Sequence, residues 1–194
     1  MIKWIAVIVG IGLLIKAFLK WKGQFLQEQM TKAFLKEMAK QARQSAGPPF
    51  EEYENLYLAL TSRTNGPADE EFEALPEEMK DLFITSVLDM EIQNGGLCQF
   101  LVNYGSECAR RAADSLRAIG FHEMADAYER FVGEQGIKLT SLQGFHSETA
   151  EQFSALYRMY PFEQFDEVYM KLRRKLKFEK TVLDYANTHP EAFR

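Results

Sequence analysis

A helical pattern that stops and restarts twice within residues 91–105 is the feature that most constrains the fold. Apolar residues recur at helical spacing up to Asn94, where Asn94-Gly95-Gly96 interrupts the pattern. A second apolar run follows at once and closes on Asn103-Tyr104-Gly105, after which helical spacing resumes. Glycine ends helices because it adopts backbone conformations that strain other residues. The stretch 91–105, the hinge stretch, therefore predicts a hinge, with Gly95 as the left-handed residue after the first helix.

Helical spacing also dominates the chain from residue 50 onward. Helices are expected to begin near residues 51, 76, 106, 121, 147, 162 and 178. No alternating apolar pattern of strand length and no fixed repeat is present. Because 46% of the residues are hydrophobic, the chain can bury a core. The sequence therefore predicts an all-α multi-helix bundle domain over residues 50–194.

A long apolar run at the N-terminus predicts a membrane anchor. Residues 4–21 contain two charged side chains, Lys16 and Lys20, both near the end of the run, and are bracketed by Trp4 and Trp21. A spanning helix needs about 20 apolar residues, and tryptophan favours the membrane interface. A cleaved signal peptide and a buried core helix are the alternatives, although no small-residue cleavage site follows the run. We expect a single N-terminal transmembrane helix over residues 1–22, with the C-terminal domain cytoplasmic because lysines follow the run.

A basic amphipathic segment follows the apolar run and ends at a Ser-Ala-Gly-Pro-Pro linker. Residues 23–49 are expected to form a stalk helix and linker between anchor and domain. The alternative is a helix that lies on anionic lipid, which would make the chain a peripheral lipid-surface protein. The side chains that would contact such a surface are Lys20, Lys22, Lys32, Lys36 and Lys40.

The net charge of −5 hides a strongly acidic segment. Residues 51–91 contain twelve acids and two bases. This predicts a solvated acidic face, Asp89 included, that binds a protein partner. Direct nucleic-acid binding is not expected, because the basic cluster at 173–180 is not part of a wider basic surface. The acidic face is expected to comprise Glu70, Glu71, Glu73, Glu77, Glu78 and Asp81.

The histidines and cysteines of the sequence do not form a recognisable metal-binding or catalytic motif. His122, His146 and His189 are far apart and belong to no zinc motif, so no metal site is expected. Cys98 and Cys108 are interpreted as small buried side chains rather than as nucleophiles. We expect no catalytic residue and no cofactor, and interpret the chain as a non-enzymatic binding protein.

The hinge stretch carries polar side chains that helix-end chemistry does not explain. Glu91 is expected to accept hydrogen bonds from backbone amides that follow Gly95. An internal hydrogen-bond network that fixes the hinge is the preferred interpretation, and an enzyme site at the same place is the alternative. The residues concerned are Glu91, Asn94, Gln99 and Asn103.

The hinge stretch resembles the central motif of a family of small helical domains named after a DNA-mimic protein. Leu97, Leu101 and Tyr104 depart from it, since the family has aromatic residues at the first two positions and serine at the third. The similarity covers about residues 52–194. The motif residues are Glu91, Asn94, Gly95, Gly96, Gln99, Phe100, Asn103 and Gly105, and later matches are Ile119-Gly120, Phe165-Asp166-Glu167, Tyr185 and His189-Pro190-Glu191-Ala192-Phe193.

The resemblance implies a helical, non-enzymatic module that binds a protein partner. The family's namesake imitates duplex DNA with an acidic dimer surface, so a homodimer is left open for this chain. Such mimicry needs carboxylates spaced like phosphates, at about 1.7 Å of axis per charge. The basic stretch 171–180 and the N-terminal apolar run depart from the family pattern. The resemblance therefore implies the fold more strongly than it implies DNA mimicry.

Overall fold

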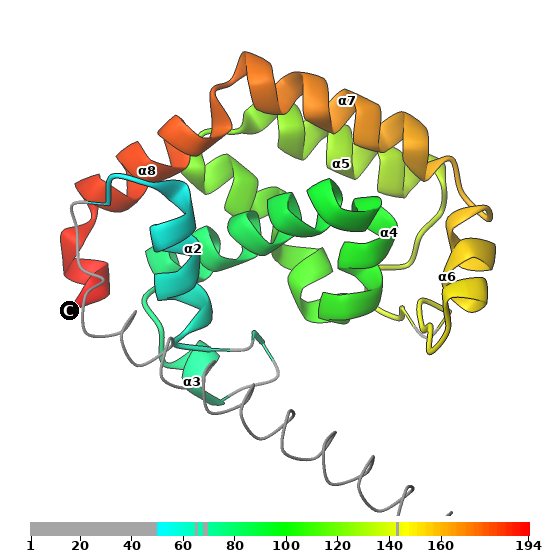
Figure 1. Ribbon diagram of the computed structural model, residues 1–194, viewed down its shortest axis with the longest axis horizontal. Coiled ribbons are helices and arrows are strands. Elements are labelled where there is room, and N and C mark those ends of the chain that lie inside the picture. The colour runs from blue at the N-terminus through cyan, green and yellow to red at the C-terminus, as the bar shows by residue number, and fades with distance from the viewer. Residues whose placement is uncertain (1–49, 65, 68–69, 143) are drawn as a thin grey trace, which may run out of the picture. The chain divides into compact units, whose positions relative to one another are not determined.

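The computed structural model describes residues 50–64, 66–67, 70–142 and 144–194, which belong to one compact unit (Figure 1). These residues form seven α-helices and one 3-10 helix, and no strand occurs among them. The predicted all-α domain is confirmed. The elements are α2 (Tyr53–Thr61), α3 (Glu70–Glu73), α4 (Glu77–Ile119), α5 (His122–Glu134), α6 (Ala150–Tyr157), α7 (Phe162–Lys175), α8 (Phe178–Thr188) and η1 (Pro190–Phe193).

The expected fold class included a transmembrane helix, and this part of it is corrected. No helix in the described ranges is long and apolar enough to cross a membrane. Each of them exposes charged side chains, which a bilayer interior does not tolerate on a lone helix. The expected anchor at 1–22, with its apolar run 4–21, and the stalk and linker at 23–49 lie outside the described residues. We therefore correct the fold class to an all-α domain and withdraw the single-pass membrane location and the cytoplasmic orientation derived from it.

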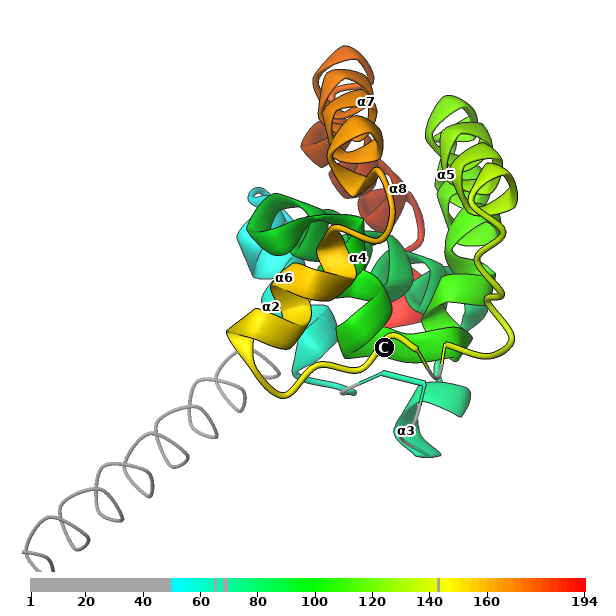
Figure 2. The same cartoon turned by 90° about the vertical axis from the view of Figure 1, so that its right-hand side faces the viewer.

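Helix α4 is the central element, and α2, α5, α7, α8 and η1 all pack against it. Figures 1 and 2 show α5 and α7 on one side of α4 and α3 on the other. Within α4 the backbone leaves helical geometry at Gly95 and Gly96, and again at Gly105. Both predicted interruptions are confirmed, but the left-handed residue is Gly96 (φ +80°), whereas Gly95 has φ −153°. Helix α4 is thus three helical segments, 77–94, 97–104 and 106–119, joined by two kinks.

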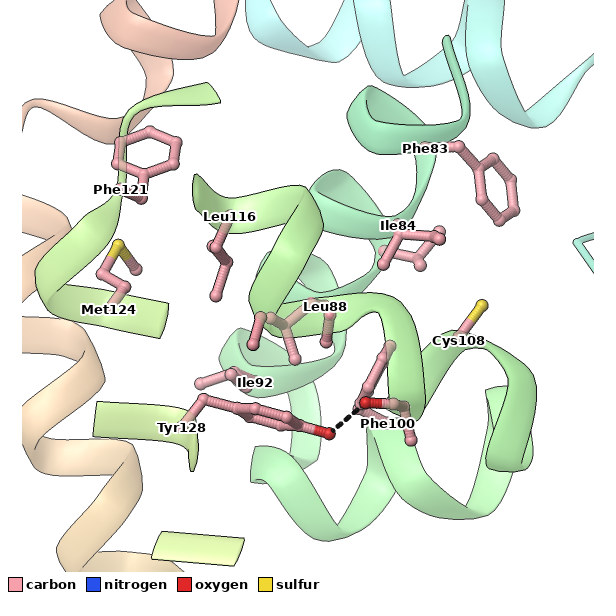
Figure 3. Packing of buried hydrophobic residues seen from close by; sticks show 14 of the residues in the cluster. Phe83, Ile84, Leu88, Ile92, Phe100, Cys108, Leu116, Phe121, Met124 and Tyr128 are labelled. Carbon is pink, nitrogen blue, oxygen red and sulfur yellow. Dashed lines mark hydrogen bonds between the residues drawn. The ribbon is translucent and has the colours of Figure 1, made fainter. Parts of the chain in front are cut away.

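The core lies where the kinked segments of α4 meet α5 (Figure 3). Leu88, Leu116 and Met124 are fully buried there. Tyr128 of α5 is buried as well, and its hydroxyl donates a 2.8 Å hydrogen bond to the carbonyl oxygen of Ala109. Small side chains on the third segment let α5 come close enough for this bond. The kinks therefore fold α4 around its own apolar side chains and leave one face for α5.

A buried ion pair joins α4 to α7. Asp89 is fully buried, and Nε of Arg173 donates a 2.8 Å hydrogen bond to its Oδ1. The hydroxyl of Tyr169 donates to the same oxygen at 3.3 Å, and Nε2 of Gln93 donates to Oδ2 at 2.8 Å. Burial raises the pKa of the Asp89 carboxyl, while the Arg173 guanidinium opposes that shift. The expectation that Asp89 is solvated is wrong, because α7 covers it.

Replacing Arg173 by methionine should lower the free energy of unfolding by about 3 kcal/mol, because Asp89 would remain buried without a cation. Urea denaturation measures this change. Arg174→Met is the matched control, since Arg174 is exposed and its substitution should change stability by less than about 0.5 kcal/mol. Equal effects of the two substitutions would show that the ion pair does not stabilise the fold.

Candidate functional site

Glu91 lies in the last turn of the first α4 segment and accepts two side-chain hydrogen bonds across the kink. Nε2 of Gln99 donates to its Oε2 at 2.5 Å, and Nδ2 of Asn103 donates to the same oxygen at 3.0 Å. Gln99 and Asn103 are four residues apart, so they share a face of the second segment. The donors are these side-chain amides and not the backbone amides that we expected. The three residues tie the first segment of α4 to the second.

Gln99 also explains why residue 95 is glycine. A Cβ atom on Gly95 would lie 2.0 Å from Oε1 of Gln99, so any side chain there would push Gln99 away. Displacing Gln99 would break its hydrogen bond to Glu91. Glycine at position 95 therefore lets this amide keep its place against Glu91.

A second contact at the kink comes from α7 and was not anticipated. Oδ1 of Asp166 accepts a 2.9 Å hydrogen bond from the backbone amide of Leu97, an N–H at the start of the second segment. The hydroxyl of Tyr157, in α6, donates to Oδ2 at 3.1 Å. A Cβ atom on Gly96 would lie 2.2 Å from Oδ2. One carboxylate thus ties α4, α6 and α7 together, and only glycine fits beneath it.

A groove of about 560 Å³ opens beside this contact. Residues 92–96 of α4 form one wall, Phe153 and Tyr157 of α6 form the other, and Asp166 lies between them. Asn94 is exposed and lines the groove, whereas Glu91, Gln99 and Asn103 do not. Phe100 is buried in the core. The structure therefore divides the expected hinge residues between an internal network and a groove.

The groove is lined by one carboxylate, Asp166, which has no ion pair among the described residues. Burial raises the pKa of its carboxyl, and the hydrogen bonds from Leu97 and Tyr157 offset part of that effect. Burial and the neighbouring carboxylate raise the pKa of Tyr157 to about 12. The Tyr157 hydroxyl therefore stays protonated at neutral pH and remains a donor to Asp166.

The two cysteines are free and fully buried. Burial raises the pKa of both Cys98 and Cys108 to about 12, so at neutral pH the nucleophilic thiolate is scarce. The interpretation of these residues as small buried side chains is confirmed. His122 and His146 are exposed, and no three His, Cys, Asp or Glu side chains in the described ranges are placed to hold a metal ion together.

The six residues of the expected acidic face lie on α3 and the first turns of α4. Glu70, Glu71 and Glu73 are exposed around the buried ring of Phe72. Glu78 is partly exposed. The four carboxylates thus lie where helix α3 and the start of α4 meet solvent.

Lys80 and Arg111 form ion pairs with two carboxylates of the acidic face. Nζ of Lys80 lies 3.5 Å from Glu73 and 2.9 Å from Glu77, and Nη2 of Arg111 lies 2.6 Å from Glu77. The side chain of Lys80 is 7% exposed, whereas that of Glu77 is 67% exposed. Hydrogen bonds from Lys80 and Arg111 lower the pKa of Glu77. Asp81 is only partly exposed and accepts a 2.7 Å hydrogen bond from Oγ of Ser115.

Replacing Gly96 by alanine should destabilise the domain by about 3 kcal/mol. The left-handed backbone costs a β-carbon about 1–2 kcal/mol, and the clash with Asp166 adds to that cost. Urea denaturation followed by circular dichroism measures the loss. Gly133→Ala in α5 is the control, because a Cβ there meets nothing within 4 Å and should stabilise the helix by about 0.5–1 kcal/mol. A neutral Gly96→Ala would refute this account of the kink.

The raised pKa of Asp166 predicts a pH dependence that Asp166→Asn removes. Because the folded state binds this proton more tightly than the unfolded chain, ionisation lowers stability as pH rises. Wild type should therefore lose unfolding free energy relative to Asp166→Asn from about pH 3.9, the ordinary carboxyl pKa, up through the raised folded pKa. Urea unfolding of both proteins at stepped pH measures the difference, and a change of the opposite sign would contradict it.

Comparison with known proteins places the chain in a family. A family model described as DMP19-like protein matches residues 73–189, a range that holds the hinge stretch, Asp166 and the acidic start of α4. No curated protein and no solved structure matches the chain. The matched range covers more than half of the 194 residues, and the chain therefore belongs to the DMP19-like protein family.

Proposed function

We propose that this chain is a non-enzymatic interaction module whose acidic face binds a basic, DNA-binding surface of a protein partner. Membership in the DMP19-like family supports a protein-binding role. The observation that carries the proposal is the layering of charge at α3 and the start of α4, where acidic side chains are exposed and the lysine that pairs with them is buried. The carboxylates of Glu73 and Glu77 are exposed, whereas Lys80, which pairs with both, is buried and Arg111, which pairs with Glu77, is only partly exposed.

This layering matters because an approaching protein meets the outermost charges first. Exposed carboxylates on one face attract lysine and arginine side chains over several ångströms and orient the encounter. The buried position of Lys80 holds the face together without presenting its charge to solvent. The described residues contain 25 Asp and Glu against 15 Lys and Arg, so the domain as a whole also attracts a basic partner.

An enzyme site at the hinge stretch has less support. Gln99 and Asn103 both donate hydrogen bonds to Glu91, and none of the three lines the groove. Their polar groups are therefore engaged in holding the kink. A general acid or base would need to reach a bound substrate.

The test uses a variant that removes charge without breaking the ion pairs of Lys80. Glu70, Glu71 and Glu78 have no ion pair among the described residues, so replacing all three by glutamine leaves Glu73 and Glu77 in place. Glu54→Gln, Glu134→Gln and Glu151→Gln together make a control with the same change in charge at other exposed positions. Cross-linked capture of partner proteins is the readout, with and without competing duplex DNA.

We expect the wild type and the control to capture the same partner, and the acidic-face variant to lose it. Duplex DNA in excess should also release the partner, because both would occupy its basic surface. Capture that survives in the acidic-face variant would overturn the proposal. Capture that resists duplex DNA would leave protein binding in place and refute the DNA-mimic part.

A further inference from the structure

We propose that the groove between the first kink of α4 and α6 is a binding site for a lysine side chain of the partner. Asp166 would supply the counter-ion, and Phe153 and Tyr157 would form the apolar wall along the alkyl stem. This inference rests on the proposed function in one respect, since the lysine belongs to the same basic partner. It assigns that partner a second point of attachment away from the acidic face.

Asp89 and Asp166 are both removed from solvent, at least in part, but only one of them has a cation as its partner among the described residues. Asp89 is buried and receives the guanidinium of Arg173. Asp166 is partly buried and receives only the neutral amide of Leu97 and the hydroxyl of Tyr157. Carboxylates removed from solvent are normally paired with a cation. Asp166 has no such partner among the described residues and lies in the wall of a groove.

The second argument is the shape and lining of the groove. Its volume of about 560 Å³ falls within the range of about 300–1,000 Å³ that ligand pockets have. Phe153 and Tyr157 lie one helical turn apart on α6, with ring centroids 6.3 Å from each other. Aromatic faces attract ammonium groups and cover alkyl chains. The first segment of α4 also ends at the groove, and the C-terminal end of a helix favours a cation.

The hydrogen bonds of Asp166 leave room for an ammonium group. Oδ1 accepts the Leu97 amide and Oδ2 accepts the Tyr157 hydroxyl, and each oxygen keeps a second lone pair. The ammonium of lysine is a compact charge that needs only one of these lone pairs.

Arg158 is the one cation among the described residues that line the groove. It is exposed and makes no ion pair within the described part of the chain. Its charge opposes a second cation in the same groove, across water that screens it in part. The proposal therefore predicts that Arg158→Gln strengthens lysine binding by a few-fold.

Amide NMR spectra of the full chain, titrated with a capped Gly-Lys-Gly peptide, test the site. The signals of Gly95, Gly96 and Leu97 should shift and saturate. The same peptide with an acetylated lysine Nε should bind at least about tenfold more weakly, because it has no charge to pair with Asp166. Asp166→Asn should abolish the difference between the two peptides, while its oxygen still accepts the Leu97 amide and preserves the fold.

Equal binding of both peptides to wild type, or an unchanged preference in Asp166→Asn, would overturn the inference. The spectrum of each unliganded variant shows whether it is folded. The two proposals fail separately. Loss of lysine-peptide binding with normal capture through Glu70, Glu71 and Glu78 would remove the groove alone. Groove binding without any effect of the acidic-face variant on capture would remove the proposed function and leave a lysine site.

Discussion

The structure depends on how backbone groups are satisfied where α4 breaks. A kink in a helix leaves N–H groups at the start of the next segment without intrahelical partners. Asp166 reaches across from α7 and accepts the one from Leu97, and the glycine at position 96 makes room for it. The same carboxylate receives Tyr157 from α6. This carboxylate therefore helps to hold α6, and with it one wall of the groove, beside the kink.

The two kinks also determine where the core lies. A straight helix over residues 77–119 would be about 65 Å long, at 1.5 Å per residue, and could not surround a core. Bending at Gly96 and Gly105 turns α4 back on itself, so that Leu88 of the first segment and Leu116 of the third both lie in the core (Figure 3). Helices α5 and α7 then cover the remaining face. In the interior, the Tyr128 hydrogen bond joins α5 to α4 and the Asp89–Arg173 ion pair joins α7 to α4.

The acidic face and the groove differ in how their carboxylates are paired with cations. On the acidic face, Lys80 and Arg111 neutralise Glu77 from beneath while Glu70 and Glu71 remain outermost. In the groove, Asp166 makes no ion pair with a described residue, although Arg158 lines the same groove. A basic protein could use both features at once. Two weak contacts on one rigid domain would then add to its affinity, because the second forms within the first complex.

The local pattern of the sequence was sufficient for the longer described helices, for both kinks and for the burial of Cys98 and Cys108, but it did not predict the short helices α3 and η1. Helical periodicity and glycine placement are properties of neighbouring residues, so they can be read along the chain. The match to Phe165-Asp166-Glu167 marked Asp166 but left its role open. The N-terminal apolar pattern, by contrast, led to a membrane anchor that the described helices do not provide.

Tertiary structure alone decided which charges are buried and what they contact. In the sequence, nothing distinguishes Asp89 from the solvated acidic residues of the same segment. It is a buried partner of Arg173 only because α7 packs over it. Asp166 and Leu97 are 69 residues apart, so no local pattern could pair them. The sequence by itself determined where the chain bends. The fold determined which side chains meet at the bend, because long-range contacts depend on packing that periodicity does not encode.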